Sequence, residues 1–210
     1  MTLEGATTLQ PAAAWLDALA VAAPDPVAAF RGIDVRAFLS VRREVRRRAG
    51  AGSALAIVPQ LGAVAAALAE IVAQLPVAAF REPGGEADWN VAQAIGHTAS
   101  ARAGLALAAS LAAGGRGPSR ARPVVPGVPG GPHADRADLL RRLAQSQRVI
   151  ERSARAIAGH ELDPCPLEHP LVGRLRCGEW LLFAGVHDLM HLEQLHALRA
   201  RHAAEPGRSS

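Results

Sequence analysis

Two histidines four residues apart are the feature of this sequence whose residue types and spacing most directly suggest chemistry. His187 and His191 lie in the stretch 178–201, GEWLLFAGVHDLMHLEQLHALRAR, which predicts a helix with an acidic residue near its start and arginines near its end. Residues four apart on a helix point the same way, so the two imidazoles can converge on one point. Burying them on a core-facing stripe costs free energy unless each finds a partner, and a metal ion is the simplest partner for both.

The predicted helix has one face whose ends are apolar and whose middle is polar. With a turn of about 100° per residue, that face holds Trp180, Phe183, Ala184, His187, His191, Gln194 and Leu198. Gln194 lies one turn beyond His191, where it can orient a ligand or a bound water, and we expect it to take part in catalysis. Asp188 lies about 100° around the helix from His187, which leaves a supporting role open.

An HxxxH pair alone is a weak signal, because surface histidines and hydrogen-bonded core histidines share the spacing. A third ligand is expected from His97, in the predicted helix 89–113, whose same face carries small residues that leave a void around the imidazole. The alternative for His97 is a core histidine bonded to a backbone carbonyl. Gln93, one turn earlier, either binds the same ligand or is a partly exposed amide near the helix start.

These residues are positioned by four long amphipathic segments, which predict an all-α fold. We expect an antiparallel four-helix bundle over residues 53–205, preceded by an N-terminal helical arm and linker, 1–52, and followed by a tail, 206–210. Asp88 and Asp135 are the expected N-caps of the second and third long helices. The four predicted helices are 57–75, 89–113, 135–158 and 178–201, and the arm is predicted to contain short helices at 10–22 and 35–48, the second capped by Asp34, with a break at 23–26.

Two loops interrupt the bundle pattern. The segment 114–134 is rich in Pro and Gly and is too long for a simple connection in a compact bundle. It is either a lid over a site or, as we favour, a disordered insertion. Its arginines, Arg116, Arg120 and Arg122, either bind carboxylates of a thiol cofactor or are solvated charges, and the second reading is favoured. The segment 163–176 is the other loop, and Gln147 in the third helix either contacts a ligand or points along the rim.

The composition supports helices and limits the choice of partners. Half of the 210 residues are hydrophobic and only 3% are aromatic, and alanine, the best helix former, is abundant. The net charge is +4 and every basic residue is arginine, which indicates coding bias rather than a nucleic-acid surface. The run Arg42–Arg48 is read as a solvated helix face, because no aromatic residues interleave with it to stack on bases. The alternative is an anion or nucleic-acid patch.

The sequence suggests a cytoplasmic protein. No signal peptide is recognised and no run of about 18 strongly apolar residues is seen, so we expect no membrane span. Cys165 and Cys177 are expected to be free thiols. Cys177 precedes the fourth long helix, whose N-terminus could lower its pKa and make it a redox thiol, but a plain buried cysteine is favoured. The remaining histidines are read as surface or structural residues, with His133 incidental to the long loop: His160, His169, His196 and His202.

Two segments of this pattern resemble the DinB-like, or YfiT-like, metalloprotein superfamily. They are ADWNVAQAIGHTASA, which contains His97, and HPLVGRLRCGEWLLFAGVHDLMHLEQL, which contains the HDxxHxxQ motif from His187 to Gln194. The resemblance covers residues 53 to 203 and implies a four-helix bundle with a divalent metal, zinc or nickel, held by three side chains. By position these are His97, His187 and His191. Some relatives that use mycothiol have Glu where this chain has His187, so the resemblance does not directly transfer their isomerase activity.

The resemblance implies a thiol-dependent S-transferase or isomerase that acts on a small electrophile. The low-molecular-weight thiol would be mycothiol or a similar compound, and a homodimer is expected from the family. Three neutral imidazoles leave a cation its full charge and an open position, which suits activation of a thiol or water. The alternative is a non-catalytic metal-binding stress or interaction protein.

Overall fold

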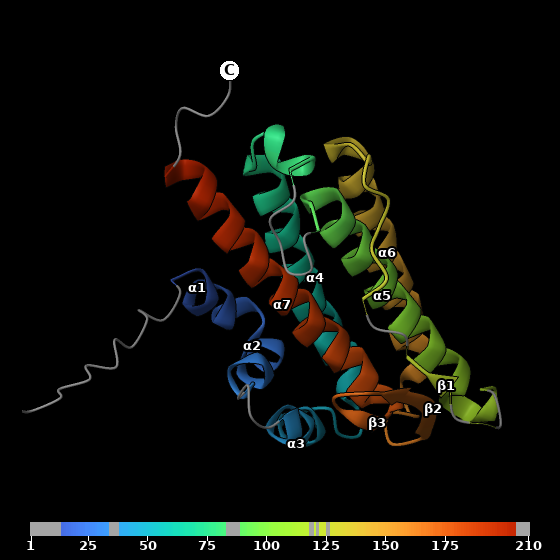
Figure 1. Ribbon diagram of the computed structural model, residues 1–210. Helices are drawn as coiled ribbons and strands as arrows, with labels where there is room; N and C mark the ends of the chain where they lie inside the picture. The colour runs from blue at the N-terminus through green and yellow to red at the C-terminus, as the bar shows by residue number, and fades with distance from the viewer. Residues whose placement is uncertain are drawn as a thin grey trace, which may run out of the picture.

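The computed structural model describes residues 14–33, 38–82, 89–117, 120, 122–124 and 127–204. Four long helices dominate it: α4 (Ser53–Gln74), α5 (Val91–Ala112), α6 (Arg136–Ile157) and α7 (Cys177–Ala204). Figure 1 shows them side by side, and α5 and α4 each pack against both α6 and α7. The predicted all-α four-helix bundle is therefore confirmed, with α4 opposite α5 and α6 opposite α7.

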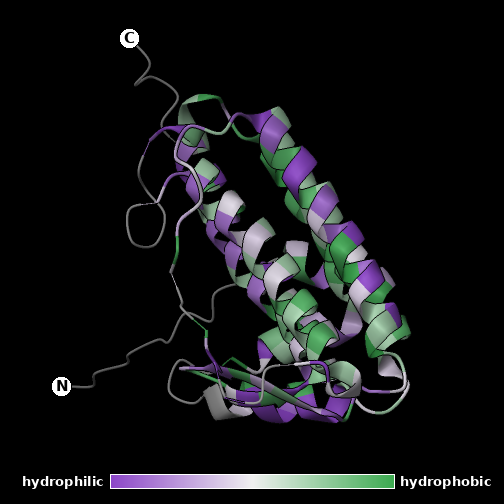
Figure 2. Ribbon diagram, turned by 90° about the vertical axis from the view of Figure 1, so that its right-hand side faces the viewer, coloured by the Kyte–Doolittle hydropathy of each residue, from purple (hydrophilic) through white to green (hydrophobic). Residues whose placement is uncertain are grey.

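The first long helix supplies the apolar seam that the sequence pattern predicts. Buried side chains recur along α4 at spacings of three and four, and in Figure 2 hydrophobic and hydrophilic residues alternate on the turns of the long helices. Pro59 lies inside α4. By length and composition alone α4 could cross a membrane, contrary to our reading of the sequence; in the bundle it is a core helix. Its buried seam comprises Ile57, Leu61, Val64, Leu68 and Ile71.

Side chains fix where α5 and α6 begin. Asn90 accepts a hydrogen bond from the Gln93 backbone N–H, and the Gln93 side chain accepts one from the Asn90 N–H, which forms a capping box. Asn90, not the expected Asp88, is therefore the N-cap of α5, and Asp88 itself lies outside the described residues. Asp135 caps α6 as expected, since its carboxylate accepts from the Asp138 N–H at 2.7 Å.

The directions of the helices differ from a fully antiparallel bundle. The start of α5 contacts the chain just before α6, because Asn90 donates to the Pro132 carbonyl, and the end of α5 contacts the chain after α6, because Gly114 donates to Asp163. Helices α5 and α6 are therefore parallel neighbours. Arg199, near the end of α7, likewise contacts Gln74 at the end of α4. The pairs α4–α6 and α5–α7 are antiparallel.

This topology explains the length of the segment between α5 and α6. A 22-residue helix is about 33 Å long, and the chain must return over that distance before α6 can run parallel to α5. A short turn cannot do this, whereas roughly twenty extended residues can. The long loop is thus required by the order of the helices rather than being an insertion into a simple connection.

The N-terminal arm is packed on the bundle. Helix α1 (Ala14–Ala22) contacts α4, and α2 (Pro24–Arg31) contacts α7 and α4. The predicted break after residue 22 is present, because α1 ends at Ala22 and Ala23 is not helical. It is shorter than the expected 23–26, since a proline is compatible with the first helical position and Pro24 begins α2. The predicted cap Asp34 lies outside the described residues. A domain boundary at residue 52 stays a prediction, since α1, α2 and α3 (Phe38–Arg48) contribute to the same hydrophobic core.

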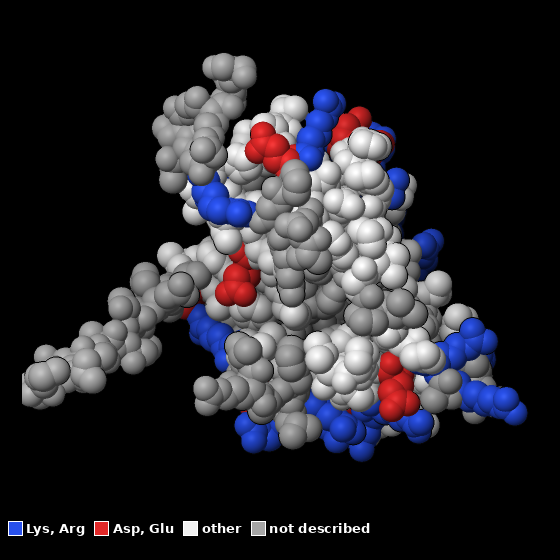
Figure 3. All heavy atoms as spheres, in the orientation of Figure 1, with Lys and Arg blue, Asp and Glu red and all other residues white. Residues whose placement is uncertain are grey.

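The arginine run lies on α3, at the end of the molecule where Figure 3 shows basic side chains gathered. Several of these arginines have acidic neighbours: Arg47 bonds Glu44 at 2.8 Å, and Arg48 bonds Asp25 at 2.9 Å. Arg46 approaches Glu179 to 3.6 Å. These pairs agree with a solvated and locally neutralised helix face.

A small sheet, which the sequence did not predict, lies at one end of the bundle. Strand β2 (Pro164–His169) pairs antiparallel with β3 (Gly173–Arg176) and parallel with β1 (Arg122–Pro123). The strands are short, and β1 and β2 contain prolines, so their sequence is typical of a loop. Through β1, the sheet fixes the middle of the long loop beside β2.

A fully buried ion pair joins α5 to α7. The Arg102 guanidinium donates to Asp188 at 2.8 Å, and both side chains have no exposed surface. Arg102 also donates to Ser146, to Gln147 and to the carbonyl of Leu61 on α4. The pair therefore connects all four long helices in the middle of the bundle.

Candidate metal centre

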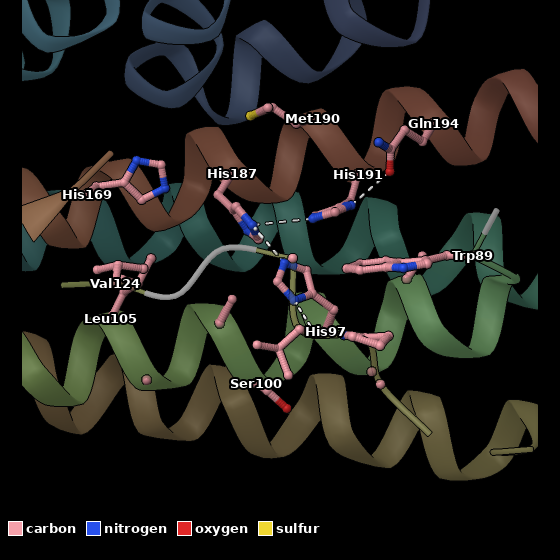
Figure 4. A pocket seen from close by; sticks show the side chains of 18 of the residues that line it. Trp89, His97, Ser100, Leu105, Val124, His169, His187, Met190, His191 and Gln194 are labelled. Carbon is pink, nitrogen blue, oxygen red and sulfur yellow. Dashed lines mark hydrogen bonds between the residues drawn. The ribbon is translucent and has the colours of Figure 1, made fainter. Parts of the chain in front are cut away.

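The three predicted histidines meet at one point between α5 and α7. The Nε2 atom of His187 lies 3.2 Å from Nε2 of His97 and 3.3 Å from Nε2 of His191. One ligand atom from each residue lies within 4.8 Å of the others. Figure 4 shows the three rings converging across the space between the helices. The convergence that helix periodicity indicated is present, and the role of the residues as metal ligands stays a prediction.

Two of the rings are oriented by hydrogen bonds at their outer nitrogens. His97 Nδ1 lies 2.8 Å from the Val128 carbonyl, and His191 Nδ1 lies 2.9 Å from Gln194 Oε1. Both partners are oxygen acceptors, so each Nδ1 must carry the proton and each Nε2 is left with a lone pair. The two lone pairs face His187. Outer hydrogen bonds of this kind are characteristic of histidines that bind metal ions.

No arrangement of protons satisfies this cluster by itself. If His187 carries its proton on Nε2, it can donate to only one of its two neighbours. If the proton is on Nδ1, three lone pairs face one another, and that Nδ1 is buried without a partner among the described residues. A cation would accept all three lone pairs. A tetrahedral site with metal–nitrogen distances of about 2.1 Å separates its ligand nitrogens by about 3.4 Å, close to the two spacings observed.

Burial keeps the cluster neutral. Desolvation lowers the pKa of His97, lowers that of His187 well below its usual value, and lowers that of His191 to about 4. For His187 the neighbouring imidazoles lower the pKa further. Neutral imidazoles at pH 7 are the form that coordinates metals. Among the described residues the group has three members, which is the number found in catalytic zinc sites that keep a position for water or substrate.

A cavity of about 620 Å³ adjoins the three histidines. Its α5 wall is made of the small residues that the sequence analysis associated with a void, among them Ala94, Ala101, Gly104 and Ala108. Its other walls are largely apolar and come from α7, β2 and the long loop. No Asp, Glu or Arg side chain lines it in the part of the chain that the structure describes.

The long loop forms one wall of this cavity, so our preference for a disordered insertion is wrong for its described part. Gly130 lies directly against Gly96 of α5, and its N–H donates to the Gln93 carbonyl at 2.9 Å. Val128 supplies the carbonyl that orients His97. Arg116, Arg120 and Arg122 are exposed and do not line the cavity, as expected for solvated charges.

The other polar side chains that the sequence suggested for the site lie in different places. Gln194 lines the cavity and orients His191, while its expected part in catalysis stays a prediction. Gln93 belongs to the capping box of α5 rather than to a ligand site. Gln147 and Asp188 bond Arg102. The sequence analysis did not predict the burial of Arg102. This residue lies on the same face of α5 as four buried apolar residues, which are Ile95, Ala99, Ala106 and Ala109.

Cys165 and Cys177 are free and buried, as predicted. A hydrogen bond to Cys165 and burial raise the pKa of the Cys177 thiol, so the start of α7 does not make it a reactive thiolate.

Among the other histidines, His160 is exposed and His196 stacks on Trp15 of α1. His169 differs from the expectation of a surface or structural residue, because it lines the cavity.

Comparison with known proteins adds a family but no individual relative. A family model described as the DinB superfamily matches residues 60–195, which is more than half of the 210-residue chain. No curated protein and no solved structure matches. The matched range contains the three clustered histidines and Gln194, and it begins after the N-terminal helices.

Proposed function

The chain belongs to the DinB superfamily, and from that premise we propose that it is a divalent-metal-dependent enzyme acting on a small electrophile. The proposed reaction is transfer of a low-molecular-weight thiol to that electrophile, or isomerisation of it. The observation that supports this best is the combination of three convergent, neutral imidazoles with a cavity at the same place. A binding site that served only to hold a metal would need the histidines but not the cavity.

His97, His187 and His191 would hold the metal through Nε2. When bound, a divalent cation lowers the pKa of a coordinated thiol or water and so supplies a nucleophile at neutral pH. Zinc and nickel are the proposed metals, because imidazole suits both. Mycothiol or another low-molecular-weight thiol is the proposed co-substrate.

The remaining residues position ligands and exclude water. Gln194 and the Val128 carbonyl hold two of the rings in the tautomer with a free Nε2. The loop that carries Val128 covers one side of the cavity and limits the access of water to the reacting groups. Apolar side chains such as Phe183 and Leu195 offer a surface for the hydrophobic part of a substrate.

Metal-loaded protein mixed with a thiol and an electrophile tests this proposal. We expect a rate above that of the uncatalysed reaction, lost in His187→Ala and retained in His133→Ala, which changes an exposed histidine of the long loop. Equal rates for wild type and His187→Ala would refute the enzymatic proposal. A bound metal with no turnover for any thiol would favour the alternative, a non-catalytic metal-binding stress or interaction protein.

The proposed setting is the cytoplasm, with a small molecule as the main partner. A homodimer is proposed from the family, and neither a membrane nor nucleic acid is expected. Sedimentation of the purified protein tests the dimer, and salt-dependent DNA binding lost on substitution of Arg43 and Arg46 would contradict the expectation on nucleic acid.

A further inference from the structure

His169 is a fourth histidine in the wall of the cavity, and the three-histidine cluster does not use it. It lies at the end of β2, and Figure 4 shows its ring beside His187, on the side away from His191. The ring is directed from β2 toward His187. Phe183 and Trp180 contact it edge-on, with ring centroids 5.4 and 6.5 Å away. The strand and these two aromatic rings therefore hold the imidazole in place.

The protonation of this ring follows from one hydrogen bond. The Leu171 backbone N–H donates to His169 Nδ1 at 3.2 Å. A nitrogen that accepts a hydrogen bond carries no proton, so the neutral ring must carry its proton on Nε2. Burial lowers the pKa of His169, which keeps the ring neutral at pH 7. Among the described residues no acceptor is recorded for this Nε2–H, and it is available to a molecule in the cavity.

The remainder of the wall limits what that molecule is. Leu105, Val124, Leu167 and Met190 are apolar parts of it, and the described lining has no charged side chain. In the metal-free protein, a carboxylate or an ammonium group placed there would lose its hydration without gaining a partner of opposite charge. An uncharged molecule with a hydrophobic body does not meet this cost.

We infer that the cavity binds an uncharged, hydrophobic carbonyl compound whose oxygen accepts a hydrogen bond from His169 Nε2–H. This inference deepens the proposed function. It rests on that function for one assumption, that the cavity is the substrate site. His169 is then a specificity-determining residue, which places the carbonyl group beside the three-histidine cluster. The cluster and His169 lie at neighbouring points of α7 and β2, so one small molecule can contact both.

Three probes of matched shape test the inference by calorimetric titration of metal-free protein, because a bound divalent cation would itself attract a carboxylate. They are 2-acetylnaphthalene, its alkene isostere 2-isopropenylnaphthalene, and 2-naphthoate. We expect the ketone to bind about five- to tenfold more tightly than the alkene, the gain of one hydrogen bond. We expect the carboxylate to bind at least about tenfold more weakly than the ketone. Equal binding of ketone and alkene, or tightest binding of the carboxylate, would overturn the inference.

Two substitutions separate the donor role from the structural role of the ring. His169→Gln places an amide N–H near the position of Nε2, and it should keep the preference for the ketone. His169→Asn keeps an acceptor for the Leu171 N–H but has no donor at that reach, and it should lose the preference. A preference that survives in His169→Asn would show that the ring is only structural. Long-range ¹H–¹⁵N spectra of the wild type provide an independent measurement, since a proton found on Nδ1 would also overturn the inference.

The same titrations distinguish failure of this inference from failure of the proposed enzyme. In His187→Ala the metal centre is disrupted, yet the ketone preference should remain because it belongs to His169. If wild type shows no turnover but keeps the preference, the proposed reaction fails alone. If wild type binds metal and turns over a substrate but shows no ketone preference, the present inference fails alone.

Discussion

Replacing Gly130 by Ala should detach the long loop from α5 and loosen the metal centre. A Cβ at this position would lie 2.7 Å from the Gly96 Cα and 2.9 Å from the Gln93 carbonyl oxygen. Both obstacles are backbone atoms of a helix, so the loop must move rather than α5. The neighbouring Gly131→Ala is a matched control, because a Cβ at Gly131 meets no atom within 4 Å.

The size of the effect follows from the contacts that this movement breaks. Two hydrogen bonds depend on the close approach: Gly130 N–H to the Gln93 carbonyl, and His97 Nδ1–H to the Val128 carbonyl. At about 1 kcal/mol each, their loss disfavours the docked loop by about 2 kcal/mol, or about thirtyfold in population. Loss of the outer partner of His97 should lower metal affinity about 10- to 100-fold.

Hydrogen exchange of the loop and a competitive chelator titration measure these two effects. We expect the amide of residue 130 to exchange about thirtyfold faster in Gly130→Ala than in wild type, with Gly131→Ala unchanged. The reciprocal Gly96→Ala, whose Cβ would lie 3.0 Å from the Gly130 Cα, should behave like Gly130→Ala. If Gly130→Ala and Gly131→Ala have the same exchange rate and metal affinity, the docked loop does not support His97.

Three further predictions concern the buried polar groups. Arg102→Met should destabilise the fold by about 3–5 kcal/mol in chemical denaturation, because it leaves Asp188 buried and unpaired. Adding Asp188→Leu to the same chain should recover part of that loss. A double variant no more stable than Arg102→Met would contradict the pairing. Gln194→Leu should lower metal affinity about 10- to 100-fold, because it removes the partner of His191 Nδ1. Glu193→Leu, at an exposed neighbour, should leave the affinity unchanged. Equal metal affinities of the two variants would contradict the role of Gln194 in orienting His191. Burial lowers the pKa of folded-state His191 to about 4, below its ordinary value of 6.5. The unfolded chain therefore binds the proton first, and the stability present above pH 6.5 is lost as the pH falls towards 4. That loss is about 3 kcal/mol for metal-free protein, and a urea-unfolding series should show it smaller in His191→Leu; equal losses would contradict the assignment.

The sequence was sufficient for those parts of the site that depend on helix periodicity. His187 and His191 are four residues apart on one helix, so their side chains lie on the same face. His97 lies on the face of a second helix that is otherwise made of small residues, and helix periodicity indicates that these two faces can meet. The same periodicity could have located Arg102 and Asp188, since each recurs in register with buried apolar residues of its helix. Arg102 was missed, and Asp188 was given only an open supporting role, because charged residues are usually on the surface and only the pairing of these two across two helices makes their burial favourable.

The parts that sequence reasoning missed depend on contacts between distant segments. Nothing local to Val128 indicates that its carbonyl meets His97, because that contact requires Gly130 to dock on Gly96. His169 was interpreted as a surface or structural residue, because nothing local to it indicates that β2 brings it to the cavity. The parallel arrangement of α5 and α6 also has no local signal, apart from the length of the loop that it requires.

Metal content after purification is the measurement that tests the central claim most directly. We expect one divalent metal ion per chain in wild type by elemental analysis, with comparable content in His160→Ala, which changes an exposed histidine. Each of His97→Ala, His187→Ala and His191→Ala should lose most of that metal while remaining folded. A wild-type protein that binds no metal at micromolar concentrations, or three variants that keep it, would contradict the account.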